Sequence, residues 1–333
     1  MRVAVIGLGL IGGSLLRALA AQPDMYVTGY DADPAVRGMA RTAAGTAPVD
    51  GRWHVAGSVS EASADADLVA IAVPFPAFAA IIDDLANSGY AGLITDVTSV
   101  KGATREVVAD RWRRSGVALA GYVGGHPMAG REISGFGGSD PGLFRGRAWA
   151  LALEPDETSM ADWLEIARLV TGSLQARVVP VTAEEHDLAV AAVSHVPHLL
   201  AAALVRAAAN NPLALALGAG SFHDGTRVAA APPSLNAAMC GANRDAVVTA
   251  LDAVFDELDA AEKALGRPDP IRALRSWFAQ PAATRQAWPP APSAPVELPV
   301  NPAVLLRLGR AGGWITDVSD DGKTVTGVRP VSP

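Results

Sequence analysis

The side chains best suited to chemistry in this sequence are a few histidines, one serine and one arginine in distinctive local contexts. His126 stands in residues 124–132 (GGHPMAGRE), between a glycine pair and a proline, so its backbone should be fixed in a loop. Histidine is the side chain whose ordinary pKa suits proton transfer near neutral pH. We therefore predict a proton-transfer role for His126, rather than a loop position without function.

Two further histidines lie in residues 194–198 (SHVPH), inside a long segment with helical periodicity. His195 and His198 are three residues apart, so both rings share one helix face, and Pro197 should kink or restart the helix. Neither Cys nor Glu stands nearby at ligand spacing, so we predict no metal site. Two polar rings on an apolar face need partners. We expect a cleft-facing role, with buried histidines bonded to backbone as the alternative.

A serine and an arginine complete the set of candidate polar residues. Ser99 lies in residues 96–101 (DVTSVK), between a predicted strand and a predicted helix, where open parallel sheets bind ligands. One side-chain hydroxyl is enough to cap that helix, so the other hydroxyl of the Thr98–Ser99 pair is available to bind a ligand. Arg227, in residues 222–227 (FHDGTR), is suited to bidentate binding of a carboxylate. A structural ion pair is the other interpretation of Arg227.

A glycine-rich turn near the N-terminus indicates a nucleotide site. Gly7, Gly9 and Gly12 form the pattern G-x-G-x-x-G between a predicted strand and a predicted helix. The pattern gives a tight turn, close approach of a pyrophosphate and close packing of helix on strand, in that order. The helix that begins at Leu10 and Ile11 then presents backbone N–H groups and a positive dipole end to the phosphates.

The residues after the second and third predicted strands define the rest of the cofactor site. Asp31 ends the second strand, where its carboxylate would accept hydrogen bonds from the adenosine ribose. It would repel a 2′-phosphate, and the nearest downstream base is Arg37, so NAD is predicted over NADP. Val73 and Pro74, at the end of the next strand, are assigned to the same site.

These residues need a parallel sheet to position them, and residues 1–124 have the alternation of strand and helix that builds one. The predicted strands are residues 2–6, 26–30, 68–73, 92–96 and 117–121, and the predicted helices include 14–21, 76–86 and 101–113. A strand pair (147–153 and 175–180) around a helical segment (158–171) extends the domain. We therefore predict an α/β fold, a Rossmann-type doubly wound sheet over residues 1–180.

The pattern changes after residue 180. Residues 181–280 are rich in Ala, Leu, Asp and Glu at helical spacing, which indicates an all-helical domain for substrate binding and dimerisation, the latter by analogy of fold. Residues 281–302 form a Pro/Ala-rich segment that we interpret as an extended, weakly ordered linker. Residues 303–333 are expected to form a small C-terminal extension.

Composition narrows the class of protein. The chain has 333 residues, half of them hydrophobic, and a formal net charge of −7 from 34 acidic and 27 basic residues without a basic run. Nucleic-acid binding is therefore not expected. Cys240 is the single cysteine, and no signal sequence is evident, which fits a reducing compartment. The apolar stretch 188–209 contains histidines and Arg206, so we expect a buried helix rather than a membrane span, and a cytoplasmic protein.

Together these motifs resemble the prephenate/arogenate dehydrogenase family. The resemblance covers about residues 1–280 and is carried by GLGLIGGSL (7–15), GYD (29–31), DVTSVK (96–101), GGHPMAGRE (124–132), SHVPH (194–198) and DGTR (224–227). It implies a homodimer that binds NAD and converts prephenate to 4-hydroxyphenylpyruvate by oxidative decarboxylation. It also implies a role for each candidate residue: His126 as the base, Ser99 as its support, His195 and His198 around substrate and nicotinamide, Arg227 on a carboxylate and Glu132 in a polar network.

The sequence bears on three alternatives, and it argues strongly against the second of them. Arogenate differs from prephenate by an amino group in place of a keto group, and the residues do not decide between these substrates. The β-hydroxyacid dehydrogenases share this domain plan but need a lysine in the second domain, and residues 181–260 contain none; the first is Lys263. A dinucleotide-sensing protein would need only the glycine turn, and it would leave the histidines and Arg227 unexplained.

Overall fold

A computed structural model describes residues 1–48, 51–116, 121–131 and 133–331 of the chain. The chain forms two compact units. The first consists of Met1–Asp187 together with Pro295–Arg329, and the second is mainly Leu188–Ala294. The first unit is therefore discontinuous in sequence, since the second is inserted between its parts.

A six-stranded parallel sheet forms the core of the first unit. Its strand order is β3-β2-β1-β4-β5-β6, the order of a Rossmann fold, which confirms the predicted fold class. The strands are β1 (Arg2–Ile6), β2 (Tyr26–Tyr30), β3 (His54–Val55), β4 (Leu68–Ile71), β5 (Leu93–Asp96) and β6 (Gly121–Val123). Part of the predicted strand 117–121 lies outside the described residues. Both faces of the sheet are apolar and covered, as parallel strands require.

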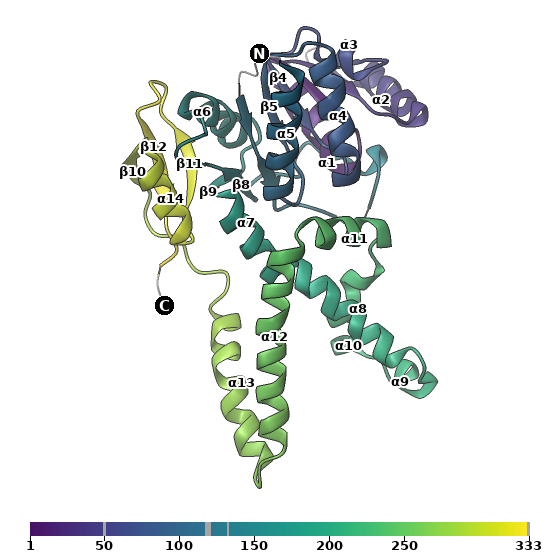
Figure 1. The fold of residues 1–333 in the computed structure, drawn as a ribbon, viewed down its shortest axis with the longest axis vertical. Helices are drawn as coiled ribbons and strands as arrows, with labels where there is room; N and C mark the ends of the chain where they lie inside the picture. Colours follow the sequence, from purple (N-terminus) through teal and green to yellow (C-terminus); the bar gives the residue numbers. More distant parts are fainter. Residues whose placement is uncertain (49–50, 117–120, 132, 332–333) are drawn as a thin grey trace. The chain divides into compact units, whose positions relative to one another are not determined.

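The crossover helices begin and end at residues whose chemistry explains the boundary. They are α1 (Leu10–Ala20), α2 (Pro34–Thr46), α3 (Val59–Ser63), α4 (Phe75–Asn87) and α5 (Gly102–Ser115), and Figure 1 shows α4 and α5 side by side. Asp33 caps α2 by accepting the Ala35 N–H at 2.8 Å, and a proline follows at the first helical position. Helix α5 stops where Gly116 takes φ +69°, the left-handed conformation that glycine favours.

A second, mixed sheet completes the first unit. Its order is β10-β12-β11-β9-β8-β7, with β7 (Gly125–Pro127) antiparallel to β8 (Ala148–Ala152) and β8 parallel to β9 (Arg177–Val181). Helix α6 (Met160–Arg168) and a π-helical turn (Leu169–Ser173) connect β8 to β9, and a 3₁₀ turn (Phe136–Gly138) lies in the loop before β8.

The C-terminal residues differ from the expected linker and small extension. Residues 281–286 continue α13, and β10 (Val296–Pro299), α14 (Pro302–Arg310), β11 (Trp314–Val318) and β12 (Thr324–Val328) follow. Strand β11 pairs with β9 through Ile315 and Val178. Figure 1 shows these two strands, yellow and teal, next to each other. Leu305, Leu306 and Leu308 of α14 join the main core. Residues Pro295–Arg329 are thus an integral layer of the first unit, whereas residues 281–294 belong to the second.

One long helical run leads from the first unit into the second. It consists of α7 (Ala183–Val190), a π-helical turn (Ala191–His195) and α8 (Val196–Ala208). The widened turn immediately precedes Pro197, whose ring excludes the carbonyl four residues earlier, so the helix restarts there as predicted. The run Ala183–Ala208 is long and apolar enough to cross a membrane by length and hydropathy alone, with mean hydropathy 1.9.

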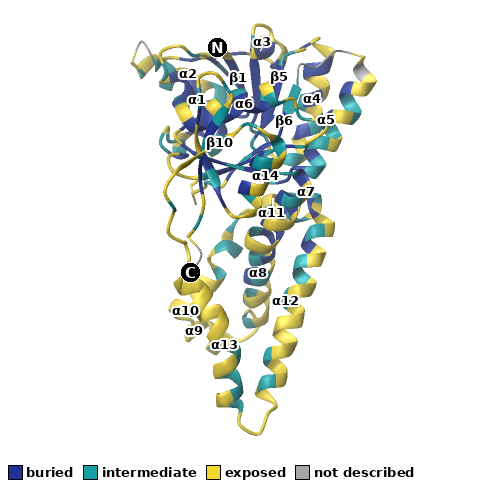
Figure 2. Cartoon of the chain, turned by 90° about the vertical axis from the view of Figure 1, so that its left-hand side faces the viewer, coloured by how far each residue is buried: buried dark blue, intermediate teal, exposed yellow. Residues whose placement is uncertain are grey.

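The second unit is helical but has little core of its own. After α8 come α9 (Pro212–Ala216), α10 (Gly220–Thr226), a 3₁₀ turn (Arg227–Ala230), α11 (Pro233–Ala242), α12 (Arg244–Leu265) and α13 (Pro270–Gln286). Helices α12 and α13 pack together as a long hairpin (Figure 1). Among the described residues its buried cluster is Ala191, Val196 and Val247. Figure 2 shows much of α9, α12 and α13 exposed.

Candidate functional site

The glycine turn has the shape that a dinucleotide pyrophosphate requires. Gly7 adopts φ +96°, and a Cβ there would lie 2.5 Å from the carbonyl oxygen of Ala72. A Cβ on Gly12 would lie 1.8 Å from the Gly7 oxygen, so both positions exclude a side chain. A Cβ on Gly9 would meet nothing within 4 Å, so the space beside this residue is open. The turn therefore leaves room for a ligand at the N-terminus of α1.

The start of α1 presents backbone donors to that open space. The helix begins with Leu10 and Ile11, both half-buried, and Gly9 precedes it as the capping residue. Among the described residues no side chain caps this helix, so its first N–H groups are available to phosphate oxygens. The residues present thus fit a bound dinucleotide.

Asp31 and Arg37 lie together at the end of β2. The Asp31 carboxylate accepts the Leu8 N–H at 2.7 Å through Oδ2 and the Asp33 N–H at 2.9 Å through Oδ1. A carboxylate has about four acceptor sites, so roughly two remain for ribose hydroxyls. Arg37 donates from Nη1 to the Asp31 and Ala32 carbonyls at 2.6 and 3.0 Å. The Arg37 guanidinium is therefore held beside the predicted ribose position.

Val73 and Pro74 border the same turn in the loop that follows β4. Val73 is half-buried, and its Cγ1 lies 2.9 Å from the position that a Cβ on Gly7 would occupy. Pro74 is exposed and precedes α4 as its N-cap residue. Val73 therefore forms part of the wall of the glycine turn.

His126 lies on β7 and is the first member of a hydrogen-bonded series. The ring is half-buried, and its Nδ1 lies 2.8 Å from Nε2 of His186. Nδ1 of His186 lies 2.7 Å from Oδ1 of Asp187. The two imidazole rings meet edge to face, with centroids 5.1 Å apart. A candidate base thus has a direct connection to a buried carboxylate, all within the first unit.

Asp187 is anchored by the start of α5. Its Oδ1 accepts the Lys101 N–H at 2.8 Å, and its Oδ2 accepts the Gly102 N–H at 2.9 Å. Burial alone would raise the pKa of this carboxyl group. The hydrogen bonds from His186 and from the two backbone groups outweigh burial and hold the pKa below its usual range. Asp187 is therefore ionised and fixed in position.

A buried ion pair joins the loop of Ser99 to the strand of His126. The ammonium group of Lys101 lies 2.5 Å from Oδ1 of Asp96 and donates to the Gly125 carbonyl at 2.6 Å. Tyr122 donates to Oδ2 of Asp96 at 2.7 Å. Burial lowers the pKa of Lys101, and the negative charge of Asp96 opposes this shift. Burial and the charge of Asp96 both raise the pKa of Tyr122. Ser99 is half-buried in the same loop.

In the second unit, His195 is an interior residue. It is completely buried, and its Nδ1 lies 3.1 Å from the side-chain amide of Asn243 on the approach to α12. His198, one helical turn later on α8, is half-buried. Asn243 supplies the partner that a buried polar ring requires. Direct contact of His195 with a substrate stays a prediction.

Arg227 and Glu132 complete the predicted set. Arg227 is exposed and follows α10 as the first residue of a 3₁₀ turn. Glu132 lies outside the described residues. The sequence did not predict His186 and Asp187, because the contact of His186 with His126 joins residues 60 positions apart. The adjacent His and Asp in residues 184–187 (EEHD), at the start of an apolar helix, were the available signal.

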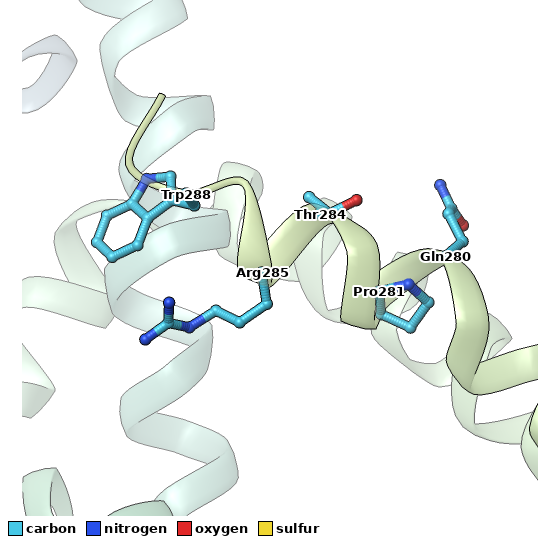
Figure 3. Close-up of a pocket in the computed structure, with 5 residues that line it drawn as sticks. All are labelled: Gln280, Pro281, Thr284, Arg285 and Trp288. Atoms are coloured by element: carbon cyan, nitrogen blue, oxygen red, sulfur yellow. The ribbon is translucent and has the colours of Figure 1, made fainter. Parts of the chain in front are cut away.

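An open hollow of about 410 Å³ lies elsewhere, on the second unit. Gln280, Pro281, Thr284, Arg285 and Trp288 line it, all from α13 and the residue pair that follows it (Figure 3). The Arg285 guanidinium lies over the Trp288 ring, 5.3 Å from its centroid. None of the predicted site residues lines this hollow.

Two family models together match most of the chain. Residues 15–180 match the prephenate dehydrogenase nucleotide-binding domain, and residues 182–280 match the prephenate dehydrogenase dimerization domain. A prephenate dehydrogenase of Bacillus subtilis is 30% identical over 264 residues, which are 77% of this chain and 68% of that protein.

Two crystal structures show the same fold. One from Corynebacterium glutamicum, described provisionally as a prephenate dehydrogenase, is 33% identical with a TM-score of 0.74, covering 87% of this chain and 90% of that one. Another, the Aquifex aeolicus prephenate dehydrogenase with hydroxyphenyl propionate and NAD⁺, is 24% identical with the same TM-score, covering 86% and 97%. The matching domains and the Bacillus subtilis relative confirm the predicted family, and the first domain is a nucleotide-binding domain. The chain belongs to the prephenate dehydrogenase family.

Proposed function

We propose that this enzyme converts prephenate, with NAD⁺, to 4-hydroxyphenylpyruvate, CO₂ and NADH. The observation that carries the proposal is the half-buried imidazole of His126, connected to an ionised carboxylate in a chain whose two domains match this family. The reaction needs one base and accurate orientation, because formation of an aromatic ring supplies much of the driving force.

The proposed chemistry balances with a single base. NAD⁺, when bound, accepts the hydride from C4 of prephenate. His126 takes the proton of the C4 hydroxyl while the C4–O bond gains double-bond character. The ring carboxylate then leaves as CO₂, and the electrons of the broken C–C bond enter the ring. The proton held by His126 returns to the same oxygen, which is now phenolic, so no net proton is released.

The glycine turn allows cofactor binding and folding to be tested separately. Because a Cβ on Gly9 would meet no protein atom, Gly9→Ala should fold normally but intrude on the pyrophosphate. We expect its KM for NAD⁺ to rise roughly tenfold or more. Gly12→Ala is the matched contrast: its Cβ would overlap the Gly7 oxygen, so it should lose about 1–3 kcal/mol of stability. Initial rates against NAD⁺ and thermal unfolding distinguish the two effects; an unchanged KM for Gly9→Ala would contradict the site.

The cofactor-binding residues proposed are Gly7, Gly9, Leu10, Ile11, Gly12, Asp31, Val73 and Pro74. Asp31 favours NAD⁺ over NADP⁺, because its carboxylate would repel a 2′-phosphate. For the substrate, we propose Ser99 beside His126, and His195, His198, Arg227 and Glu132 around the acid. These assignments are supported by the family motifs in which the residues stand.

Arg227 is the residue proposed to bind a substrate carboxylate. Replacing it with alanine removes a cation that can bind a carboxylate through two hydrogen bonds. We expect KM for prephenate to rise by one to two orders of magnitude, which corresponds to a loss of about 1.5–3 kcal/mol of binding free energy. The value of kcat should change much less. Arg267→Ala, a surface arginine on the turn between α12 and α13, serves as the control. Steady-state kinetics that leave KM unchanged in Arg227→Ala would place the carboxylate anchor elsewhere.

We further propose a homodimer formed through the helical unit, acting in the cytoplasm. Large apolar side chains are exposed along this unit, among them Leu217 (72%), Ile271 (75%) and Phe255 (54%). Surfaces of this kind mark protein interfaces, and the matching family model is a dimerization domain. The small core of this unit also supports burial against a second copy.

The decisive test is the formation of NADH by purified protein. Prephenate and arogenate are each offered with NAD⁺ and with NADP⁺. Turnover of prephenate with NAD⁺ is expected. Turnover of arogenate alone would establish the alternative substrate, and binding of NAD⁺ without turnover of either acid would support a dinucleotide-sensing protein.

A further inference from the structure

The hydrogen-bonded series Asp187–His186–His126 has a carboxylate at one end and an imidazole at the other. This difference determines which ring nitrogens carry hydrogen. We infer that Asp187 and His186 are positioning residues that hold His126 with hydrogen on Nδ1 and the lone pair on Nε2, the form that acts as a base. The inference rests on the proposed function for the role of His126, but the tautomer itself is measurable without any substrate.

The order of donors follows from the carboxylate. Ionised Asp187 only accepts, so Nδ1 of His186, 2.7 Å away, must donate to it. A neutral imidazole carries one N–H, which leaves Nε2 of His186 as an acceptor. Nδ1 of His126, 2.8 Å away, must then donate to that nitrogen. The lone pair of His126 is therefore on Nε2.

His186 is kept neutral by its surroundings. Burial lowers the pKa of His186, the hydrogen bond to Asp187 opposes this, and the nearby ammonium group of Lys101 lowers it further. His186 itself is only 2% exposed. A buried imidazole with these neighbours carries no charge near neutral pH. It therefore donates to the carboxylate through one nitrogen and accepts from His126 through the other.

The same residues also favour the protonated state that His126 reaches during the reaction. The ionisable groups around His186 are Asp187, Lys101 and Asp96, with Tyr122 on Asp96. Lys101 and Asp96 neutralise each other as an ion pair, which leaves the negative charge of Asp187. That charge lies one ring beyond His126 and stabilises an imidazolium there, as the aspartate of a catalytic triad does.

Asp187 is suited to this role because hydrogen bonds prevent its carboxylate group from rotating. Two backbone N–H groups at the start of α5 hold its two oxygens at 2.8 and 2.9 Å. It is one residue from His186 on the same helix, so the pair moves together. Outer residues that orient a metal-bound histidine in the same way typically contribute about 10–100-fold, and we expect an effect of this size here.

The tautomer is tested directly by nitrogen NMR of protein labelled in its histidines, of which the chain has six. The His126 signals, assigned by their loss in His126→Asn, should show hydrogen on Nδ1 without substrate present. In His186→Phe the acceptor is gone, and both tautomers should appear. In His186→Gln the amide oxygen can accept from Nδ1, so the original tautomer should return. Hydrogen on Nε2 of His126 in the unaltered protein would overturn the inference.

Kinetics test the consequence for catalysis. With prephenate, His186→Phe should lower kcat about 10–100-fold with little change in KM, and His186→Gln should recover part of it. Asp187→Asn removes the charge, so the acid limb of the kcat–pH profile should move to lower pH while the maximal kcat falls. A merely structural role would lower kcat without moving the profile, and that result would overturn the inference.

Controls separate folding and function. His54→Gln alters a histidine that faces Glu61 at the surface, and Asp321→Asn alters an aspartate in the turn between β11 and β12. Both should behave as the unaltered enzyme. Thermal unfolding shows whether Asp187→Asn disturbs the start of α5, which His186→Gln leaves intact. If the protein turns over no prephenate, the NMR result still decides the tautomer, so the two proposals fail separately.

Discussion

Asparagine in place of His126 is expected to lower kcat by roughly 10²–10⁴-fold, the usual contribution of a general base. The asparagine amide can still donate to Nε2 of His186, so the neighbouring side chains should keep their positions. What is lost is the basic nitrogen, because an amide does not accept a proton near neutral pH. Since binding of the acid depends on other groups, its KM should change little.

The measurement is steady-state NADH formation from prephenate, with thermal unfolding to confirm that the variant is folded. His54→Asn is the matched control, since it makes the same substitution at a largely exposed histidine outside the proposed sites. A kcat for His126→Asn within a few-fold of the control would remove His126 as the base. It would leave the family assignment unaffected.

Replacing Lys101 with methionine is expected to destabilise the first unit by about 3–5 kcal/mol, because it leaves the buried carboxylate of Asp96 without its cation. Lys101 and Asp96 are 1% and 0% exposed, so water cannot replace the lost partner. The Gly125 carbonyl, next to His126, would lose a hydrogen bond as well. We therefore expect reduced activity to accompany the lower stability.

Denaturant unfolding followed by circular dichroism measures this effect. The double variant Asp96→Asn/Lys101→Met removes the charge as well as its partner, so it should recover a large part of the loss. Lys263→Met breaks an exposed pair with Asp259 on α12 and should cause no measurable change. A Lys101→Met protein as stable as the unaltered one would contradict this prediction.

The first part of the fold could be predicted because its signals are local. The predicted ranges 2–6 and 26–30 match β1 and β2. The glycine pattern between them allows one backbone conformation of the turn. Asp31 follows from its position at the end of β2. These predictions depend on neighbours in sequence, which is why they agree with the structure in detail.

Pairing between distant residues could not be predicted in this way. Strand β11 pairs with β9, more than a hundred residues earlier, and the proline-rich segment before these strands gives no sign of that partner. Helix α13 also continues through Pro281 at the start of the expected linker. His195 shows the same limit: helical spacing placed it on one face with His198, but not beside Asn243.

The discontinuity of the first unit has a consequence for synthesis on the ribosome. The chain emerges from its N-terminus, so the parallel sheet and the helical insertion are complete before β10, β11 and β12 exist. Until then one edge of β9 has no partner strand and the apolar face that α14 covers is open to solvent. Nascent chains paused within residues 188–294 should therefore be the species most prone to aggregate and most dependent on chaperones.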